Sequence, residues 1–406
     1  MTADRRAVFL TVVISALGYF VDIYDLLLFG IVRVPSLRAL GVPEDQLLDV
    51  GLRLLNFQMA GMLLGGVIWG VLGDLRGRKS VLFGSILMYS LANIGNAFVP
   101  NAQVYAWLRF IAGVGLAGEL GAAITLVSEV MSKEMRGYGT TAVASVGILG
   151  AVLASAIGDH FDWKIAYLVG GGMGLALLVL RAGLLESGMF HAMHARSVAR
   201  GKFYQLFTRR VTFTRYLCCI LIGVPIWFVI GILITFAPEL ARELGVTGAI
   251  TGSKSIMWAY AGLSLGDLAS GLLSQKLRSR RKAVFLFMTF TLALIFAYVY
   301  QSGWSVTEFY TLCFALGFGV GYWAVFVTIG AEQFGTNIRA TVATTVPNFV
   351  RGSVVPVTLS FQALRPEFGM VNAALTVGVA VMAVAYGALY FLRETYGKDL
   401  DYFETL

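Results

Sequence analysis

The chain has 406 residues, of which 58% are hydrophobic and only 13% are charged, and its formal net charge is +8. A soluble domain has roughly 45–50% apolar and 25% charged residues, so this composition excludes a water-soluble globular protein. The mean hydropathy of +0.77 indicates that most of the chain lies in a lipid bilayer. The positive charge lies mainly in loops between apolar runs, which disfavours nucleic-acid binding as its explanation.

Twelve apolar runs follow one another along the chain, and each is close to the roughly 20 residues that a membrane-spanning helix needs. None shows the alternating pattern of a transmembrane β-barrel, so the sequence predicts an all-α membrane protein with twelve transmembrane helices in two six-helix bundles. The predicted helices cover 8–32, 54–73, 80–99, 104–130, 138–158, 165–185, 216–236, 254–274, 283–300, 306–331, 341–363 and 371–392.

A long basic segment near the midpoint separates the first six predicted helices from the last six. We therefore expect an N-terminal bundle at 1–185, a cytoplasmic linker at 186–215 and a C-terminal bundle at 216–406. Most of the 31 lysines and arginines lie in this linker and in alternate loops. The positive-inside rule assigns those segments to the cytoplasm, and with them both termini.

Two tight basic turns occupy equivalent places in the two halves. The first follows the second predicted helix and reads Gly70-Val-Leu-Gly-Asp74-Leu-Arg76-Gly-Arg78-Lys79. The second follows the eighth and reads Gly271-Leu-Leu-Ser-Gln-Lys276-Leu-Arg278-Ser-Arg280-Arg281-Lys282. An acid followed seven residues later by an arginine also recurs, as Glu129 with Arg136 and as Glu332 with Arg339. The order of these segments predicts an internal six-plus-six duplication.

These segments resemble the signature loop and the fourth- and tenth-helix patterns of the major facilitator superfamily. The resemblance covers most of the chain and implies a secondary transporter whose two bundles surround a shared cavity. It also implies that the loop aspartate caps the eleventh helix and that Arg78 contacts Glu129. Leu75 and Gln275 depart from the pattern. The inner-gate residues expected from the resemblance are Asp74, Arg78, Glu129, Arg136, Glu332 and Arg339.

Few ionisable side chains lie at bilayer depth, where each costs at least roughly 2.5–3.5 kcal/mol to insert and is therefore a functional candidate. With a rise of 1.5 Å per residue, Asp25 and Arg109 lie about 10 and 8 Å from the outer ends of their helices. Glu119 and Arg351 each lie about 15–16 Å from the inner ends. We therefore expect two acid–base pairs at matching heights. The candidates are Asp22, Asp25, Arg109, Glu119, Asp267 and Arg351.

An acid beside an arginine in a membrane cavity forms a proton switch. The arginine favours the ionised carboxylate and burial opposes it, so movement of the arginine lets the acid protonate. The segment Asp22-Ile-Tyr24-Asp25 resembles the first-helix motif of metabolite:proton symporters, and Gly118-Glu119-Leu-Gly121-Ala122 resembles their fourth-helix motif. Sugar-porter relatives also pair a first-helix aspartate with a fourth-helix arginine. The proton-coupling residues expected are Asp22, Asp25, Arg109 and Glu119.

Structural roles are open alternatives for the same charges. Asp25 with Arg109 also suits a clamp whose protonation never changes, and Glu119 also suits a hydrogen bond between helices. Arg351 is compatible with permanent pairing to an acid, while Asp267 is typical of a helix-packing or gate residue.

Arg351 lies beside a proline and a glycine in Pro347-Asn348-Phe-Val-Arg351-Gly352. A guanidinium at this depth favours carboxylate or phosphate recognition. Helices one, seven and ten line the cavity in the family that the chain resembles, and they carry several aromatic residues. The substrate-binding residues expected are Arg351, Tyr24, Asn56, Gln58, Trp227, Tyr322, Trp323 and Asn348.

The sequence thus predicts a monomeric secondary transporter that moves a small polar metabolite, expected to be an organic anion, with protons by alternating access across a bacterial inner membrane. Its expected partners are substrate, protons and lipid. No cofactor or metal is expected, because the three cysteines lack metal-binding spacing and no Walker motif occurs. A drug/proton antiporter or another exporter is the nearest alternative. The intramembrane charges disfavour a non-transporting receptor, and the lack of a nucleophile–base spacing disfavours an enzyme.

Overall fold

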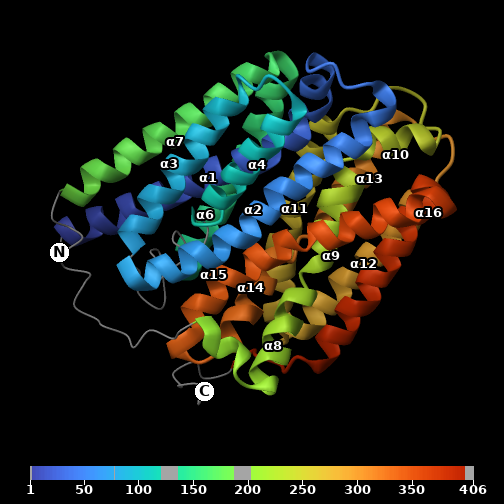
Figure 1. Ribbon diagram of the computed structural model, residues 1–406. Coiled ribbons are helices and arrows are strands. Elements are labelled where there is room, and N and C mark those ends of the chain that lie inside the picture. The colour runs from blue at the N-terminus through green and yellow to red at the C-terminus, as the bar shows by residue number, and fades with distance from the viewer. Residues whose placement is uncertain (1, 77, 120–135, 187–202, 398–406) are drawn as a thin grey trace. The chain divides into compact units, whose positions relative to one another are not determined.

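The computed structural model describes residues 2–76, 78–119, 136–186 and 203–397. In these ranges the regular elements are helices, and the only β-type pairing is an isolated bridge between Thr247 and Ser305. Figure 1 shows these helices as long rods joined by short turns. The all-α architecture expected from the apolar runs is therefore confirmed for the described residues.

The chain forms two compact units. The first contains Met1–Phe29, Val34–Glu44 and Arg53–Gly201, and the second contains Gly30–Arg33, Asp45–Leu52 and Lys202–Leu406. Two short pieces of the N-terminal half thus pack with the C-terminal helices. The predicted linker falls largely on residues 187–202, outside the described ranges, so its boundaries stay a prediction.

The N-terminal half begins with a helix longer than the sequence predicted, because helical structure continues through Pro35. The fourth run was predicted to continue to residue 130, but its helix ends at Leu116 and a turn follows at 117–118. The helices of this half are α1 (Thr2–Ala39), η1 (Glu44–Gln46), α2 (Leu47–Arg76), α3 (Arg78–Asn96), α4 (Ala102–Leu116), α6 (Arg136–His160) and α7 (Trp163–Glu186).

The C-terminal half is more interrupted than the apolar runs indicated. Its elements are η3 (Phe203–Phe207), α8 (Arg210–Leu221), α9 (Val224–Phe228), η4 (Val229–Ile234), α10 (Ala237–Glu243), α11 (Gly252–Lys276), α12 (Arg280–Tyr300), α13 (Val306–Gly319), α14 (Trp323–Glu332), α15 (Thr336–Gly352) and α16 (Val354–Phe391).

The seventh predicted helix, 216–236, is divided among three elements, α8, α9 and η4, and α10 follows it. Pro225 lacks a backbone N–H and follows Gly223, which accounts for the break between α8 and α9. The next element, η4, is a π-helix, and it ends where the N–H of Thr235 donates to the carbonyl of Ile230 over 3.1 Å. Pro238 then lies in the first turn of α10. Since π-helical turns occur mostly at functional sites, this helix is a candidate moving part.

Breaks also occur within the tenth and eleventh predicted helices. The tenth divides at residues 320–322, between α13 and α14, and the eleventh divides at Ser353, between α15 and α16. The boundary expected between 363 and 371 is present as a kink inside α16, where Gly369 has φ 73° and ψ 169°. Glycine adopts this conformation without the steric penalty of a side chain. The length of an apolar run does not reveal a break as short as those at 320–322 and at Ser353.

Eight segments within the described ranges are long and apolar enough to cross a membrane, and two apolar helices are shorter. Their exposed side chains include Leu272, Tyr390 and Phe391, which are each more than 70% accessible. A bilayer accommodates such an apolar exterior, whereas water would not.

Glycine brings helix backbones into contact at corresponding places in the two halves. A Cβ atom on Gly113 of α4 would lie 2.1 Å from the carbonyl oxygen of Gln58 in α2. A Cβ atom on Gly317 of α13 would lie 1.8 Å from the carbonyl oxygen of Ala259 in α11. Small residues permit this approach in membranes, where van der Waals packing associates helices. Each half therefore contains a second-to-fourth-helix contact that depends on glycine.

We expect Gly317→Ala to lower the apparent melting temperature, because the added methyl group meets backbone that moves only if α11 and α13 separate. Overpacking of this kind costs about 1–3 kcal/mol. Gly387→Ala is the matched control, since nothing lies within 4 Å of a Cβ at this helical glycine. Thermal unfolding in detergent checks this, and equal melting temperatures for the two variants would contradict the packing account.

Candidate functional site

Asp25 is fully buried in the first unit, where α1 lies against α7. A Cβ atom on Gly170 of α7 would lie 2.3 Å from its Oδ1, so glycine provides the space for the carboxyl group. The polar groups that act on it include Arg109, Asp22 and Asn93. Neither carboxylate oxygen makes a hydrogen bond of good geometry to a described residue. The structure therefore brings Asp25 and Arg109 into one buried cluster, as their heights predicted.

Arg109 extends from α4 and is also fully buried. Its Nη1 donates to Oδ1 of Asn93 over 3.3 Å. The guanidinium carbon lies 5.5 Å from the ring centroid of Phe29 and 5.7 Å from that of Tyr167. Cation–π attraction at such distances strengthens when the groups are desolvated. The arginine is therefore held by two aromatic rings and one amide beside the acid.

Three hydroxyl groups extend this cluster toward the outer ends of the helices. The phenol oxygens of Tyr105 and Tyr167 are 2.5 Å apart, and Ser36 Oγ lies 3.3 Å from the Tyr105 phenol oxygen. Tyr24, predicted to contact substrate, instead donates to the carbonyl of Ala166 over 2.8 Å. Sequence reasoning missed Tyr105 and Tyr167, although Tyr105 lies four residues before Arg109 and hence on the same helix face.

Glu119 has a different partner from the one that helix heights indicated. Arg181 of α7 donates from Nη1 to Oε2 over 2.9 Å and forms a second, shorter contact from Nη2 to Oε1. Both side chains are buried, and Gly18 of α1 lies against the pair. The match of Glu119 with Arg351 was wrong, because height alone cannot identify which helix faces an acid. A bidentate arginine favours an ionised, structural glutamate.

Arg351 lies in the last turn of α15 in the second unit and is 1% exposed. Its guanidinium carbon is 5.8 Å from the ring centroid of Trp323, the first residue of α14. Asn348 is buried one turn earlier and donates to the carbonyl of Thr344 over 3.1 Å. A cation, an indole ring and an amide thus lie on adjacent helices, which is a suitable environment for a planar anion.

The remaining predicted substrate contacts differ in their environments. The Tyr322 hydroxyl donates to the carbonyl of Ile222 over 3.0 Å, which is a bond between helices. Gln58 similarly donates to the carbonyl of Leu26 over 3.3 Å, and Asn56 is half-buried. Trp227 is buried next to the π-helix, and its Nε1 has no hydrogen-bond partner among the described residues. Trp227 Nε1 and Gln58 Oε1 are therefore buried polar atoms that remain available among the described residues.

Asp267 of α11 has a structural role. Its Oδ1 accepts the backbone N–H of Ala324 over 3.0 Å, at the first turn of α14. A carboxylate at a helix N-terminus satisfies a free N–H and interacts favourably with the helix dipole. Asp267 therefore stabilises the break before α14 and fixes the start of the helix that carries Trp323.

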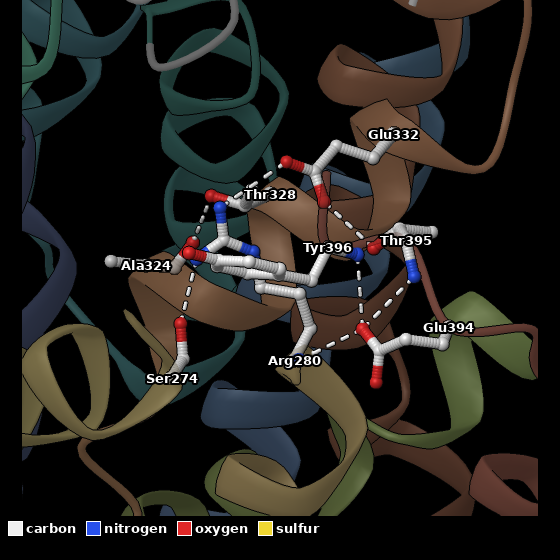
Figure 2. A network of polar contacts seen from close by, with 8 residues as sticks. All are labelled: Ser274, Arg280, Ala324, Thr328, Glu332, Glu394, Thr395 and Tyr396. Carbon is white, nitrogen blue, oxygen red and sulfur yellow. Dashed lines mark hydrogen bonds and ion pairs between the residues drawn. The ribbon is translucent and has the colours of Figure 1, made fainter. Parts of the chain in front are cut away.

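The second unit contains a polar network around the start of α12 and the end of α14 (Figure 2). Glu332 contacts Arg280 over 3.4 Å and accepts from the Thr395 hydroxyl over 2.7 Å. Glu394 accepts the backbone N–H of Arg280 over 2.9 Å and therefore caps α12. Partial burial opposes ionisation of Glu394, but hydrogen bonds from Ser279 and backbone amides outweigh it and hold the pKa of this carboxyl below its usual value.

Most of the predicted inner gate lies outside the described residues or side chains. Glu129 lies outside the described residues. The structure does not describe the side chains of Asp74, Arg78, Arg136 and Arg339. Their roles stay predictions. The second repeat does contain a loop arginine paired with an acid, Arg280 with Glu332, in the place corresponding to the expected contact of Arg78 with Glu129.

A buried ion pair that the sequence analysis did not anticipate lies in the second unit. Arg33, in the piece of α1 that packs with this unit, contacts Glu239 of α10 over 2.6 Å. The guanidinium also lies 4.5 Å from the ring centroid of Phe236. Arg33 lies one residue beyond the first predicted helix, 8–32, because that helix end was estimated from hydropathy. No group of metal-ligating side chains occurs among the residues that the structure describes.

Comparison with known proteins identifies relatives along nearly the whole chain. The sequence profile of the Major Facilitator Superfamily matches residues 8–352. The niacin transporter NiaP of Acinetobacter baylyi is 28% identical, with 86% of each chain covered. The gentisate transporter of Corynebacterium glutamicum is 25% identical over 92% of this chain and 86% of that protein. The crystal structure of a D-xylose-proton symporter has a TM-score of 0.70 at 16% identity, covering 97% and 99% of the two chains.

We expect Glu119→Gln to destabilise the protein by about 3–5 kcal/mol, because it leaves Arg181 as a buried and uncompensated charge. Replacing both residues, as Glu119→Met with Arg181→Met, is expected to recover most of this loss. Melting temperatures of the three proteins in detergent test this. A single variant as stable as the parent protein would show that the pair is not a structural clamp.

Proposed function

The chain belongs to the Major Facilitator Superfamily, and on this premise we propose that it moves a small organic anion together with protons by alternating access. Membership makes the protein a multi-pass membrane transporter rather than an enzyme. The proposal adds the coupling ion and the class of substrate, each of which is argued from one of the two units.

The buried carboxyl group of Asp25 carries the proton-coupling part of the proposal. It lies beside the Arg109 cation and has no hydrogen bond of good geometry to a described residue. Burial favours the protonated form of such a carboxyl group and the arginine favours the ionised form, so a movement of the arginine changes which form is preferred. Glu119 is instead bound by two contacts from Arg181, so the proton is assigned to Asp25, with Asp22 next to it.

Arg351 and Trp323 carry the substrate part. A guanidinium binds a carboxylate through parallel hydrogen bonds, and an adjacent indole favours a planar or aromatic substrate body. Relatives with 25% and 28% identity are named for gentisate and niacin transport. Small aromatic carboxylates are therefore the first class to test, with Asn348 and Trp227 as further contacts. A drug exporter would have less need for a buried cation at this position.

The distribution of lysine and arginine supports an orientation in which both termini lie in the cytoplasm of a bacterium, and the proposed transporter works as a monomer. Inward-facing loops would then include the basic turn before α12, and the Asn101 cap of α4 would lie on the outer side.

Uptake by proteoliposomes with an imposed pH gradient, inside alkaline, tests the function directly. We expect accumulation of at least one small aromatic carboxylate that collapses when a protonophore removes the gradient. Accumulation of organic cations alone, or carboxylate uptake indifferent to the gradient, would contradict the proposal.

Asp25→Asn is expected to abolish gradient-driven accumulation, because the amide cannot release a proton, while exchange of labelled for unlabelled substrate continues. Asp159→Asn is the control, since this acid is exposed at the end of α6. Accumulation and exchange are measured in the same vesicles. Normal accumulation by Asp25→Asn would remove Asp25 from the coupling mechanism.

Arg351→Gln is expected to raise the apparent KM for the carboxylate by about 10- to 150-fold, which corresponds to the loss of one charged hydrogen-bonded contact of about 1.5–3 kcal/mol. Arg242→Gln provides the control, because this arginine is exposed at the end of α10. An unchanged KM in folded Arg351→Gln protein would assign the arginine a purely structural role.

A further inference from the structure

The cluster around Asp25 contains two tyrosines with no assigned role. Tyr105 of α4 and Tyr167 of α7 are both completely buried, and their phenol oxygens are 2.5 Å apart. Ser36 of α1 adds a third hydroxyl at 3.3 Å from Tyr105. Three helices thus meet through a short chain of hydroxyl groups. Burying these polar groups is favourable only when they bond to one another, which makes the arrangement well determined.

The Tyr167 ring lies against the Arg109 cation, with 5.7 Å between its centroid and the guanidinium carbon. Besides contacting this ring and that of Phe29, Arg109 donates a hydrogen bond to Asn93, and its Nε and Nη2 have no hydrogen-bond partner among the described residues. Arg181 differs, because two contacts fix it on Glu119. The position of Arg109 therefore depends on the aromatic rings that face it.

From this geometry we infer that Tyr167, itself held by Tyr105, is a positioning residue that keeps Arg109 beside Asp25 and so sets the pH at which the transporter loads its proton. The inference rests on the proposed function and identifies a determinant of its coupling. Tyr167 needs no direct contact with substrate or proton for this role.

Among the described residues, Arg109 is the cation that acts on Asp25. The groups facing the carboxyl come from each helix packed around it. They are Asp22 and Tyr24 of α1, Tyr89 and Asn93 of α3, Arg109 of α4 and Tyr167 of α7. Displacing Arg109 leaves Asp22, an acid, as the principal charged neighbour. The Asp25 carboxylate would then take up a proton at a higher pH.

The test is the pH profile of uptake in proteoliposomes for Tyr167→Phe, which keeps the ring and removes the hydroxyl. We expect half-maximal uptake at a pH about half a unit to one unit higher than for the parent protein, since one hydrogen bond restrains the ring. Tyr105→Phe removes the same bond from the other side and should produce a similar shift. The double variant should shift no further than either single variant.

Tyr298→Phe is the matched control. Tyr298 is equally buried, but its hydroxyl donates to the carbonyl of Leu233 in the second unit, over 3.0 Å. This variant should lower the melting temperature without moving the pH profile. If Tyr167→Phe fails to fold, the profile of Tyr105→Phe decides the question.

Three outcomes would overturn the inference. Tyr167→Phe could give an unshifted profile with only a reduced maximal rate, or the two single shifts could add in the double variant. In both cases gradient-driven uptake by the parent protein would leave the proposed function standing. Uptake by the parent protein that did not depend on pH would instead refute the proposed function, and the inference with it.

Discussion

The balance between burial and a neighbouring cation controls the chemistry of the first unit. Burial raises the free energy of ionising Asp25, and Arg109 offsets this increase only while its guanidinium stays close. Most features of this unit serve that proximity. Gly170 makes room for the carboxyl group, Phe29 and Tyr167 face the arginine, and neighbouring hydroxyl groups fix the ring. A rigid surround with one loosely bonded cation is what a reversible proton site requires.

Two of the buried acids of the first unit, Glu119 and Asp25, show how the same residue types acquire different roles. Glu119 is met by both terminal nitrogens of Arg181, so its charge is fully compensated and the pair ties helices together. Asp25 has an arginine nearby that is bonded elsewhere. In the second unit, Asp267 is committed to the N-terminus of α14. Only geometry separates these three carboxyl groups, because all lie within predicted membrane helices.

The sequence predicted the all-α fold, the repeat and the proximity of Asp25 to Arg109, because apolar length, basic turns and helix rise are local properties. It did not predict that Arg181 pairs with Glu119 or that Arg33 pairs with Glu239, since both depend on which helix faces form contacts. The breaks at Gly223, residues 320–322 and Ser353 were missed for another reason. Hydropathy averages over a window, and a one-residue interruption leaves that average unchanged.

The contact between Gly170 and Asp25 has a consequence for how the first unit can change shape. A Cβ atom on Gly170 would lie 2.3 Å from Oδ1 of Asp25, so the carboxyl group occupies the space that this glycine leaves on the surface of α7. Sliding α1 along α7 would move the carboxyl group out of the space that Gly170 provides for it. We therefore expect α1 and α7 to move together as one rigid body. The motion that opens a path for the substrate would then occur at other helix contacts.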